Sequence, residues 1–300
     1  MLPKFPEFKK LELSDQEDIE KITSQYEPYS DFNFANMWAW DVYSVCELSV
    51  LHHNLVIRFF DPITQKQAYS YLGQSGISKT VSDIFNFFDK NNLTDCSMKL
   101  VPEVSLAGLD FTKHFIEIDM NSCDYMYDLV ALASLSGNKY SQKRGRSNNF
   151  KTHYPTATVS VLDLHSPSTV AEINGLNSIW MKNKSGSSVD LSQEMLAIDR
   201  FISSGIKQYL SLGVYVDKKL IGYTVFSFHG TDNAINLFIK GDMFYVGVYE
   251  FVMQLSAQIL MDKGYKYMNY QEDLGIDGLR RAKLAFRPTG YLRKYFIKKL

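Results

Sequence analysis

The segment with the clearest chemical potential in this sequence combines an acidic pair with basic residues on the helix that follows. Glu272 and Asp273 come directly after a predicted strand, Tyr265–Tyr270, where α/β proteins commonly hold ligands. Carboxylates at that position can hold the ammonium group of a substrate or accept its proton. The structural alternative is an ion-paired helix start, because acidic residues are favoured near helix N-termini.

The predicted helix Gly275–Leu284 carries the basic residues of this segment. Arg280 and Lys283 are three residues apart, so they share one helical face and can meet a phosphate or carboxylate. Asn269, at the end of the preceding strand, is counted with them as a substrate-binding residue. The segment therefore predicts an anion-binding face beside an acidic pair.

A second segment, residues 137–151, is basic in an otherwise balanced chain. The whole sequence has 32 basic and 33 acidic residues, a formal net charge of −1, yet this stretch contains no acid. Its cations are Lys139, Lys143, Arg144, Arg146 and Lys151, and its neutral donors include Tyr140, Ser141, Asn148 and Asn149. Such donors suit the phosphates of RNA, of a coenzyme or of a lipid headgroup. A solvated basic helix face is the alternative.

Composition excludes several classes of protein. A content of 45% hydrophobic and 22% charged residues is that of a folded globular chain, and the net charge argues against nucleic-acid binding by bulk charge. Three scattered cysteines and six histidines show no metal-ligand spacing, so we expect neither a metal site nor a disulfide framework. No signal peptide and no apolar run of ~18 residues is visible, which predicts a cytoplasmic protein without a transmembrane segment.

The elements that position both segments fall into two halves with the same order. Each half reads as helix, helix, three antiparallel-type strands, helix, strand, helix and strand, and the last strand is Tyr291–Ile297. This order resembles the GCN5-related N-acetyltransferase (GNAT) fold. We therefore expect an α+β protein of two tandem GNAT-like domains, with mixed, mostly antiparallel sheets flanked by helices. The predicted parts are residues 1–123, a basic bridging segment 124–155, and residues 156–300; one unrelated mixed α/β domain is the alternative.

Both unusual segments carry motifs of a known family. The sequence around Asp124–Tyr127, Gly137–Tyr140, Lys143-Arg144 and Tyr154-Pro155, and again along Gln271–Lys283, resembles the family related to the C-terminal domain of phosphatidylglycerol lysyltransferase. Further matching residues lie between these motifs: Trp180, Glu194, Lys240, Gly247 and Tyr249. The resemblance covers nearly the whole chain and implies the tandem GNAT-like fold.

The resemblance also implies an activity. The best understood relatives move an aminoacyl group from a charged tRNA to an amine or hydroxyl of a lipid or of peptidoglycan. It therefore implies an aminoacyl- or acyltransferase without a tightly bound cofactor, whose donor substrate is aminoacyl-tRNA or acyl-CoA. The expected partners are tRNA or an anionic lipid headgroup, with a small-molecule amine as acceptor. Because the flippase region of full lysyltransferases is not part of this sequence, we expect action from the cytoplasm or at the inner membrane surface.

The roles that follow for individual residues are expectations at this stage. Asp273, with Glu272, is the expected catalytic pair and holds the ammonium of donor or acceptor. The expected substrate-binding residues are Asn269, Arg280, Lys283, Trp180, Glu194 and Lys240. The expected phosphate, RNA or headgroup ligands are Lys139, Tyr140, Lys143, Arg144, Arg146 and Asn149. The family's Lys-Arg-Asn motif is interrupted here, because Gly145 and Arg146 precede Asn148.

The loop between the third strand of the second half and its long helix separates the two donor classes. GNAT enzymes that use acetyl-CoA carry a glycine-rich loop there, whose bare amides hold the pyrophosphate at the helix N-terminus. The matching stretch, Lys240–Gly247, contains Asp242, which repels a diphosphate, and three bulky residues. This favours aminoacyl-tRNA as donor. The alternatives are an acyl-CoA-dependent N-acyltransferase acting on a small amine, and a non-catalytic module that binds RNA or anionic lipid.

Overall fold

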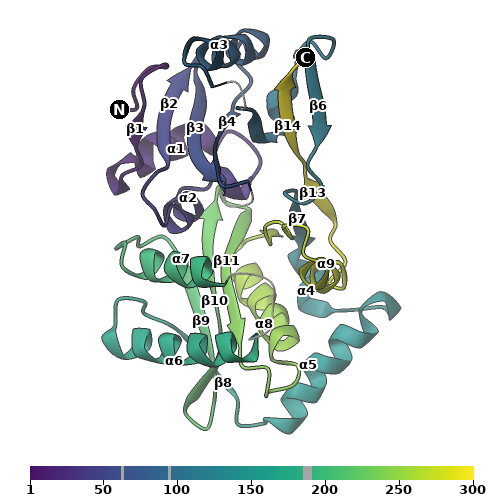
Figure 1. Cartoon of the computed structure of the whole chain (residues 1–300). Coiled ribbons are helices and arrows are strands. Elements are labelled where there is room, and N and C mark those ends of the chain that lie inside the picture. The colour runs from purple at the N-terminus through teal and green to yellow at the C-terminus, as the bar shows by residue number, and fades with distance from the viewer. Residues whose placement is uncertain (62–63, 94–95, 185–190) are drawn as a thin grey trace. The chain divides into compact units, whose positions relative to one another are not determined.

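Two compact units make up the protein. The computed structural model describes residues 1–61, 64–93, 96–184 and 191–300 (Figure 1). The first unit contains Met1–Asp124, Glu272–Gly275 and Tyr291–Leu300, and the second contains Tyr125–Gln271 and Ile276–Gly290. Each unit is built on one seven-stranded sheet with flanking helices, which confirms the predicted α+β class of two mixed, mostly antiparallel sheets. Within the described residues, no helix has the length and apolar character needed to cross a bilayer.

The sheet of the first unit has the strand order β1-β2-β3-β4-β5-β14-β6. Its neighbours pair antiparallel except β4 and β5, which are parallel and meet only at Tyr69 and Met98 in register. The elements are β1 (Lys9–Lys10), α1 (Gln16–Thr23), α2 (Phe34–Trp40), β2 (Glu47–Leu51), β3 (Asn54–Asp61), β4 (Lys66–Leu72), α3 (Ile77–Lys90), β5 (Met98–Pro102), β6 (His114–Ile118) and β14 (Lys294–Lys299), with 3-10 turns at Leu13–Asp15, Ser30–Phe32 and Glu103–Leu106.

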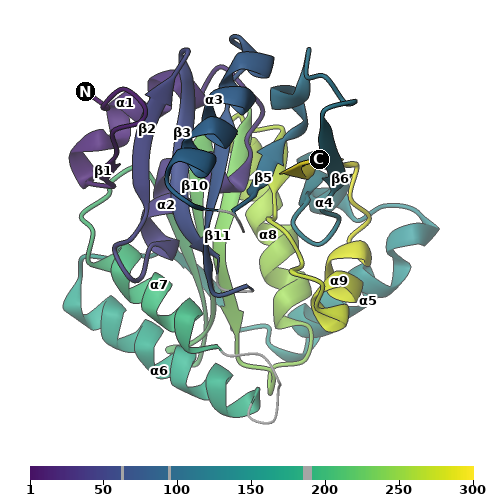
Figure 2. The same cartoon turned by 45° about the horizontal axis from the view of Figure 1, so that its top comes forward.

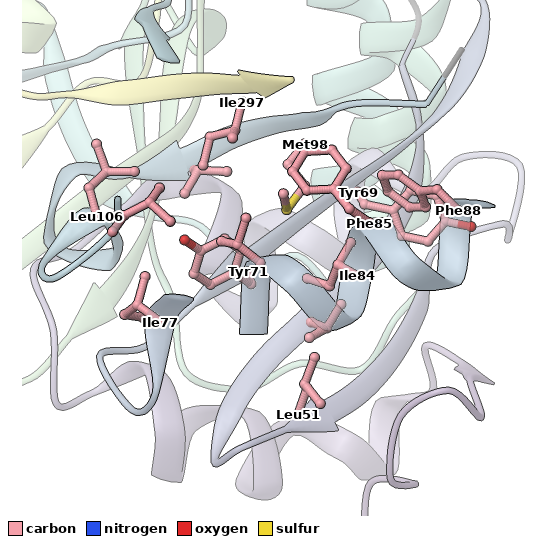
Figure 3. Packing of buried hydrophobic residues seen from close by; sticks show 14 residues of the cluster. Leu51, Tyr69, Tyr71, Ile77, Ile84, Phe85, Phe88, Met98, Leu106 and Ile297 are labelled. Atoms are coloured by element: carbon pink, nitrogen blue, oxygen red, sulfur yellow. The ribbon is translucent and has the colours of Figure 1, made fainter. Parts of the chain in front are cut away.

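The core of this unit forms where the apolar face of α3 packs on the sheet (Figure 3). Ile84, Phe85 and Phe88 recur at helical spacing and lie against Tyr69 and the neighbouring strands, as the periodicity predicts. The helix begins at Ile77, three residues before Thr80. Gly76 adopts φ +55° before the first turn, and the Thr80 hydroxyl is buried as an acceptor for Asn54 Nδ2 at 2.8 Å instead of capping the helix.

The sheet of the second unit has the order β13-β7-β12-β11-β10-β9-β8. Pairing is parallel between β11 and β12 and antiparallel in the pairs β8–β9, β9–β10, β10–β11 and β12–β7. The elements are β7 (Asp124–Asp128), α4 (Leu129–Ser134), 3-10 turn Asn138–Tyr140, α5 (Ser141–His153), β8 (Thr158–Val161), α6 (Pro167–Asn183), α7 (Ser192–Ile202), β9 (Leu210–Val216), β10 (Lys219–His229), β11 (Asn233–Gly241), α8 (Val248–Asp262), β12 (Tyr267–Asn269), α9 (Asp277–Leu284) and β13 (Gly290–Leu292).

Helices cover both faces of this second sheet. Successive residues of β10 point to opposite sides: a Cβ at Gly222 would meet Val248 and Val252 of α8, whereas the hydroxyl of Tyr223 donates to Asn177 of α6 at 2.8 Å. α6 and α7 lie side by side in both views (Figure 2). The end of β11 is therefore available to α6 and α7 on one face and to α8 on the other.

The C-terminal strand β14 returns to the first sheet after the chain has built the second sheet. In the first sheet β14 lies between β5 and β6, and β14 follows β13 of the second sheet in sequence. In the second sheet β7 lies between β12 and β13, and β7 follows β6 of the first sheet. β7 starts the second unit, so β14 is the strand that crosses back, and its Ile297 lies in the core of the first unit.

The positions of β7 and β14 change the predicted division of the chain into domains. The expected bridging segment 124–155 is not a separate linker, because all of it after Asp124 folds into the second unit as β7, α4 and α5. Tyr291–Leu300 was expected in the C-terminal domain and belongs to the first unit. The predicted single strand Tyr291–Ile297 is two strands interrupted at Arg293, because its halves belong to different sheets.

Candidate functional site

The end of β11 carries a buried lysine that brings together three of the predicted substrate-binding residues. The Nζ atom of Lys240 lies 4.1 Å from the ring centroid of Trp180 on α6 and forms an ion pair with Glu194 on α7. Lys240 is 3% exposed, whereas the Glu194 side chain retains 26% of its exposure. The ammonium is therefore held by an aromatic face and a carboxylate whose outer part is accessible to solvent.

Burial decides the protonation behaviour of Lys240. Desolvation lowers the pKa of Lys240, and the neighbouring Glu194 opposes this lowering without cancelling it. A lysine in such surroundings releases its proton more readily than one in water, and the neutral amine can then accept a proton from a substrate. Lys240 is thus the residue of this unit that combines burial, a charged neighbour and a lowered pKa.

Tyr249 of α8 fixes the strand end that carries Lys240. The backbone N–H of Gly241 donates to the Tyr249 hydroxyl at 3.2 Å. Burial raises the pKa of Tyr249 to about 12, so the hydroxyl stays protonated. A Cβ at Gly241 would lie 2.9 Å from Val248, which shows how closely α8 approaches the strand. Tyr249 therefore holds Gly241, and through it the neighbouring Lys240, from the opposite face of the sheet.

The first turn of α8, next along the chain, is closed by groups of the protein itself. A Cβ at Gly247, which has φ +90°, would overlap the carbonyl oxygen of Arg146 on α5. The carboxylate of Glu250 lies 3.0 Å from Lys143 Nζ and 3.4 Å from Arg146 Nη1. The helix N-terminus, which attracts anions, is thus already supplied with an internal carboxylate and two cations.

The loop before this turn also uses its own hydrogen-bonding groups. Asp242 accepts from the N–H of Phe244 at 3.1 Å through its carboxylate, and from the N–H of Tyr245 at 3.0 Å through its carbonyl. The Asp242 N–H donates to the carbonyl of Ile221 at 2.8 Å, and Lys219 Nζ lies 3.2 Å from the Asp242 carboxylate. The amides that a GNAT-type loop offers to pyrophosphate are therefore partly occupied by Asp242.

The predicted phosphate-binding residues on and before α5 divide into two groups. Tyr140 and Lys143 are buried, and Arg144 Nη1 donates to the carbonyls of Leu135 and, at 3.1 Å, Gly137 at the end of α4. Lys139, Arg146 and Asn149 are exposed. The buried group joins α5 to α4 and α8, and the exposed group is the part of the basic segment that a ligand can reach.

The two predicted anion-binding residues of the Gln271–Lys283 motif differ in burial. Lys283 is buried, donates to the carbonyl of Tyr270 and lies 4.7 Å from the Tyr270 ring centroid and 5.6 Å from that of Tyr125. Arg280, one turn earlier, is half-buried. Lys283 therefore fastens α9 to the sheet, and its ammonium is directed at backbone and aromatic rings.

Asn269 shapes the point where β11 and β12 part. Their parallel pairing ends at Ile235 and Asn269, although β11 continues to Gly241. The Asn269 side chain accepts from the Gln271 N–H at 2.6 Å, and Gln271 Nε2 donates to the carbonyls of Asn236 at 2.6 Å and Leu237 at 3.2 Å. Asn269 thus orients a glutamine that bridges to β11 just beyond the end of its pairing with β12.

The expected catalytic pair lies in the first unit, in the short segment 272–275. Asp273 is fully buried, and its carboxylate accepts from the Gly275 N–H at 2.8 Å, which stabilises a turn in which Gly275 has φ +72°. Glu272 Oε2 lies 3.8 Å from Lys294 Nζ. The two acidic residues therefore have different surroundings: one stabilises a turn, and the other faces a buried lysine.

Sequence reasoning missed the cluster around that lysine. Lys294 of β14 has no exposed side-chain surface, lies 2.7 Å from the equally buried Asp124, and pairs with Asp31. Asp124 also accepts from the N–H and hydroxyl of Ser30 at 2.8 and 2.7 Å. These residues come from separate parts of the chain and follow no short motif. Simple alternation gives no signal for Lys294, because Lys294 and Ile297 are three residues apart and the ladder of β14 is irregular between Tyr295 and Ile297.

The charges of this cluster do not balance when all its carboxylates are ionised. Burial raises the pKa of Asp31 to about 7; Lys294 opposes this, while Glu272 and Asp124 add to it. The surrounding carboxylates raise the pKa of Lys294 despite its burial. At neutral pH the cluster can therefore hold one shared proton. No group of His, Cys, Asp or Glu suited to a metal ion occurs in the described part of the chain.

Comparison with known proteins agrees with this architecture. A family model described as phosphatidylglycerol lysyltransferase, C-terminal, matches residues 23–298. An uncharacterised protein of Mycoplasmoides gallisepticum is 21% identical over 311 residues, covering 96% of this chain and 98% of that protein. A solved protein of unknown function from Bacteroides thetaiotaomicron covers 100% of both chains at 23% identity with a TM-score of 0.84. The C-terminal domain of a putative lysylphosphatidylglycerol synthetase from Agrobacterium fabrum covers 95% of this chain and 91% of its own at 13% identity with a TM-score of 0.64. Since the family model spans most of the sequence, the chain belongs to the phosphatidylglycerol lysyltransferase C-terminal family.

Proposed function

We propose that this protein transfers an aminoacyl or related acyl group from an activated ester to an amine or hydroxyl acceptor, with aminoacyl-tRNA as the donor. Family membership supports a transferase, and the similarity to the C-terminal domain of a putative lysylphosphatidylglycerol synthetase from Agrobacterium fabrum supports a lipid acceptor. The acceptor's amine or hydroxyl attacks the ester carbonyl carbon, a new bond to nitrogen or oxygen forms, and the ester C–O bond breaks.

The observation that carries the choice of donor is the closed first turn of α8. Glu250 with Lys143 and Arg146 occupies the helix N-terminus where GNAT enzymes bind pyrophosphate, and Asp242 occupies loop amides. A diphosphate there would meet two carboxylates and the Arg146 carbonyl. A tRNA donor needs no such pyrophosphate site, because its backbone is held over a wide surface by exposed cations such as Lys139 and Arg146.

Within this function Lys240 is the proposed proton acceptor. Its lowered pKa makes the neutral amine available, and the proton it takes from the acceptor returns to the leaving hydroxyl oxygen of the donor. Glu194 and the Trp180 face hold the resulting ammonium. Separately, in the first unit, Glu272 with its partly exposed side chain remains a proposed holder of a substrate ammonium, whereas the fully buried Asp273 stabilises the turn beside it. In the second unit, Arg280 is a proposed partner for a substrate anion.

The test is a transfer assay with purified protein. Charged tRNAs carrying labelled amino acids, and labelled acyl-CoA in parallel, are incubated with phosphatidylglycerol vesicles and with soluble amines. We expect label to move from tRNA and not from CoA. Lys240→Met should lower the rate by roughly 10²-fold or more, whereas the matched control Lys263→Met, on the exposed end of α8, should not.

Other outcomes distinguish the alternatives. Transfer from acyl-CoA alone, together with thermal stabilisation by CoA and none by tRNA, would establish an N-acyltransferase instead. Absence of transfer from every donor, with binding of RNA or anionic lipid preserved, would identify a non-catalytic binding module.

A further inference from the structure

The loop between β11 and α8 presents apolar side chains to solvent. Met243, Phe244 and Val246 keep 52%, 79% and 60% of their surface exposed. Their backbone is firmly held, because the loop forms the hydrogen bonds of Asp242 described above and the Val248 N–H donates to the Tyr245 carbonyl at 3.1 Å. Fully exposed aromatic and aliphatic residues on a well-held loop are typical of an interaction surface.

The side of the loop that faces the protein is packed. The ring of Tyr245 lies 5.0 Å from that of Tyr154 at the end of α5 and 5.5 Å from that of Phe244. Tyr245 thus anchors the loop, while the residues on either side of it point outward. The exposure of Met243, Phe244 and Val246 is therefore a property of the fold and not of a loose segment.

Cations surround this apolar tip. Lys219 Nζ lies 5.6 Å from the Tyr245 ring centroid, Lys218 precedes it in an exposed turn, and α5 brings the half-exposed Arg146 against Gly247. The nearby carboxylates of Asp242 and Glu250 are buried in ion pairs with Lys219 and Lys143. Asp217, beside Lys218, is an exposed acid in the same turn, and it is outnumbered by Lys218, Lys219 and Arg146. The charge that these residues present to solvent near the tip is therefore positive on balance.

We propose that residues 242–247, with Lys218, Lys219 and Arg146, dock the protein on an anionic lipid bilayer, and that Met243, Phe244 and Val246 enter the headgroup region. The transfer of apolar side chains from water into the membrane interface lowers the free energy, and anionic headgroups attract adjacent lysines and arginines. The inference goes beyond the proposed transfer reaction, since it concerns a separate surface and is measured without any donor.

The chemistry of the tip favours a bilayer over RNA. Two of its three outward side chains, Met243 and Val246, are aliphatic and provide no flat face on which a base can stack. A disordered lipid interface accepts aromatic, thioether and branched side chains alike. RNA binding at this loop is therefore the competing outcome of the test.

The experiment is co-sedimentation of the full chain with vesicles of pure phosphatidylcholine or of phosphatidylcholine with phosphatidylglycerol. We expect binding to the anionic vesicles that weakens with added salt. Phe244→Asp should reduce that binding at least tenfold, and Lys218→Glu several-fold. The matched control is Val130→Asp on α4, which introduces the same charge at a side chain 59% exposed and should bind as the unaltered protein does.

A second variant reports insertion directly. Phe244→Trp should show a blue shift of tryptophan emission with anionic vesicles that the parent protein, with its three native tryptophans, does not show. Equal vesicle binding by Phe244→Asp and Val130→Asp, or an unshifted Phe244→Trp spectrum on bound vesicles, would overturn the proposal. So would a loss of tRNA binding by Phe244→Asp with vesicle binding intact. Because no transfer is measured, loss of docking is distinguishable from loss of the proposed reaction.

Discussion

The ammonium of Lys143 on α5 lies 3.0 Å from the carboxylate of Glu250 in the first turn of α8. Both side chains are buried, and the Lys143 ammonium also lies 4.3 Å from the ring centroid of Phe286. One residue of the basic segment therefore neutralises an acid that the fold places at a helix N-terminus. The same segment leaves Lys139 and Arg146 exposed, so its structural and ligand-facing cations can be tested separately.

Lys143→Met should lower the free energy of unfolding by about 3 kcal/mol, because it leaves Glu250 buried with a weaker partner. The double variant Lys143→Met/Glu250→Met should recover much of this loss, since an apolar pair replaces a buried ion pair at little cost. Denaturant unfolding measures both. A double variant that loses as much as the sum of both single variants would contradict the pairing.

Lys139→Met should behave in the opposite way. The residue is exposed, so the free energy of unfolding should change by less than about 0.5 kcal/mol. If the exposed end of the basic segment holds RNA phosphates, the affinity for tRNA should fall. The slope of the logarithm of the binding constant against the logarithm of the salt concentration should decrease in magnitude by about one. Titrations at several salt concentrations check this, and an unchanged slope would remove Lys139 from the binding surface.

Asp31 should make the protein less stable as the pH rises toward neutrality. Its pKa is raised to about 7 in the folded protein from 3.8, so the folded state binds more protons than the unfolded state between these values. The stabilising contribution is complete below about pH 4 and is lost as the pH rises through 7. Asp31→Asn removes this proton uptake, which changes the free energy of unfolding by up to about 1.4 kcal/mol per pH unit. Denaturant unfolding between pH 4 and 8 should therefore show a more positive slope for Asp31→Asn than for the parent. The control Asp262→Asn, at an exposed position, should keep the parental slope.

Removal of residues 293–300 should disrupt the first unit although these residues end the chain. Without β14, strands β5 and β6 lose the neighbour that lies between them, and Ile297 leaves the core. Amide exchange in β5 and β6 should become fast, while β9 and β10 remain protected. Deleting Lys299 and Leu300 alone is the control. If β5 and β6 remain protected in the longer deletion, the first sheet forms without β14.

The return of β14 to the first sheet marks the limit of prediction from the sequence. Helices such as α3 and α8 are predictable because apolar residues recur along many turns, and hairpins are predictable because turn residues separate alternating strands. Tandem order and the family followed from such elements and from two motifs. The assignment of β7 to the second sheet and of β14 to the first depends on partners more than a hundred residues away, which no local pattern encodes. For the same reason the Lys240, Trp180 and Glu194 contact was anticipated only as membership in a family pattern, and the Lys294 cluster not at all.

The role of Lys240 is best separated from a structural one by the pH dependence of transfer. If the neutral amine accepts the acceptor's proton, the rate should fall as the pH drops below the lowered pKa of Lys240, where the amine becomes charged. Lys240→Met should be slower by roughly 10²-fold or more and should lack this acidic limb, because no amine is left to titrate. Lys240→Arg keeps the positive charge over Trp180 and opposite Glu194, so it should retain tRNA binding yet transfer as slowly as Lys240→Met. Single-turnover rates from pH 5 to 9 measure these differences. If Lys240→Arg transfers at the parental rate, the residue acts as a fixed charge that positions substrate, and the proton must leave by another group.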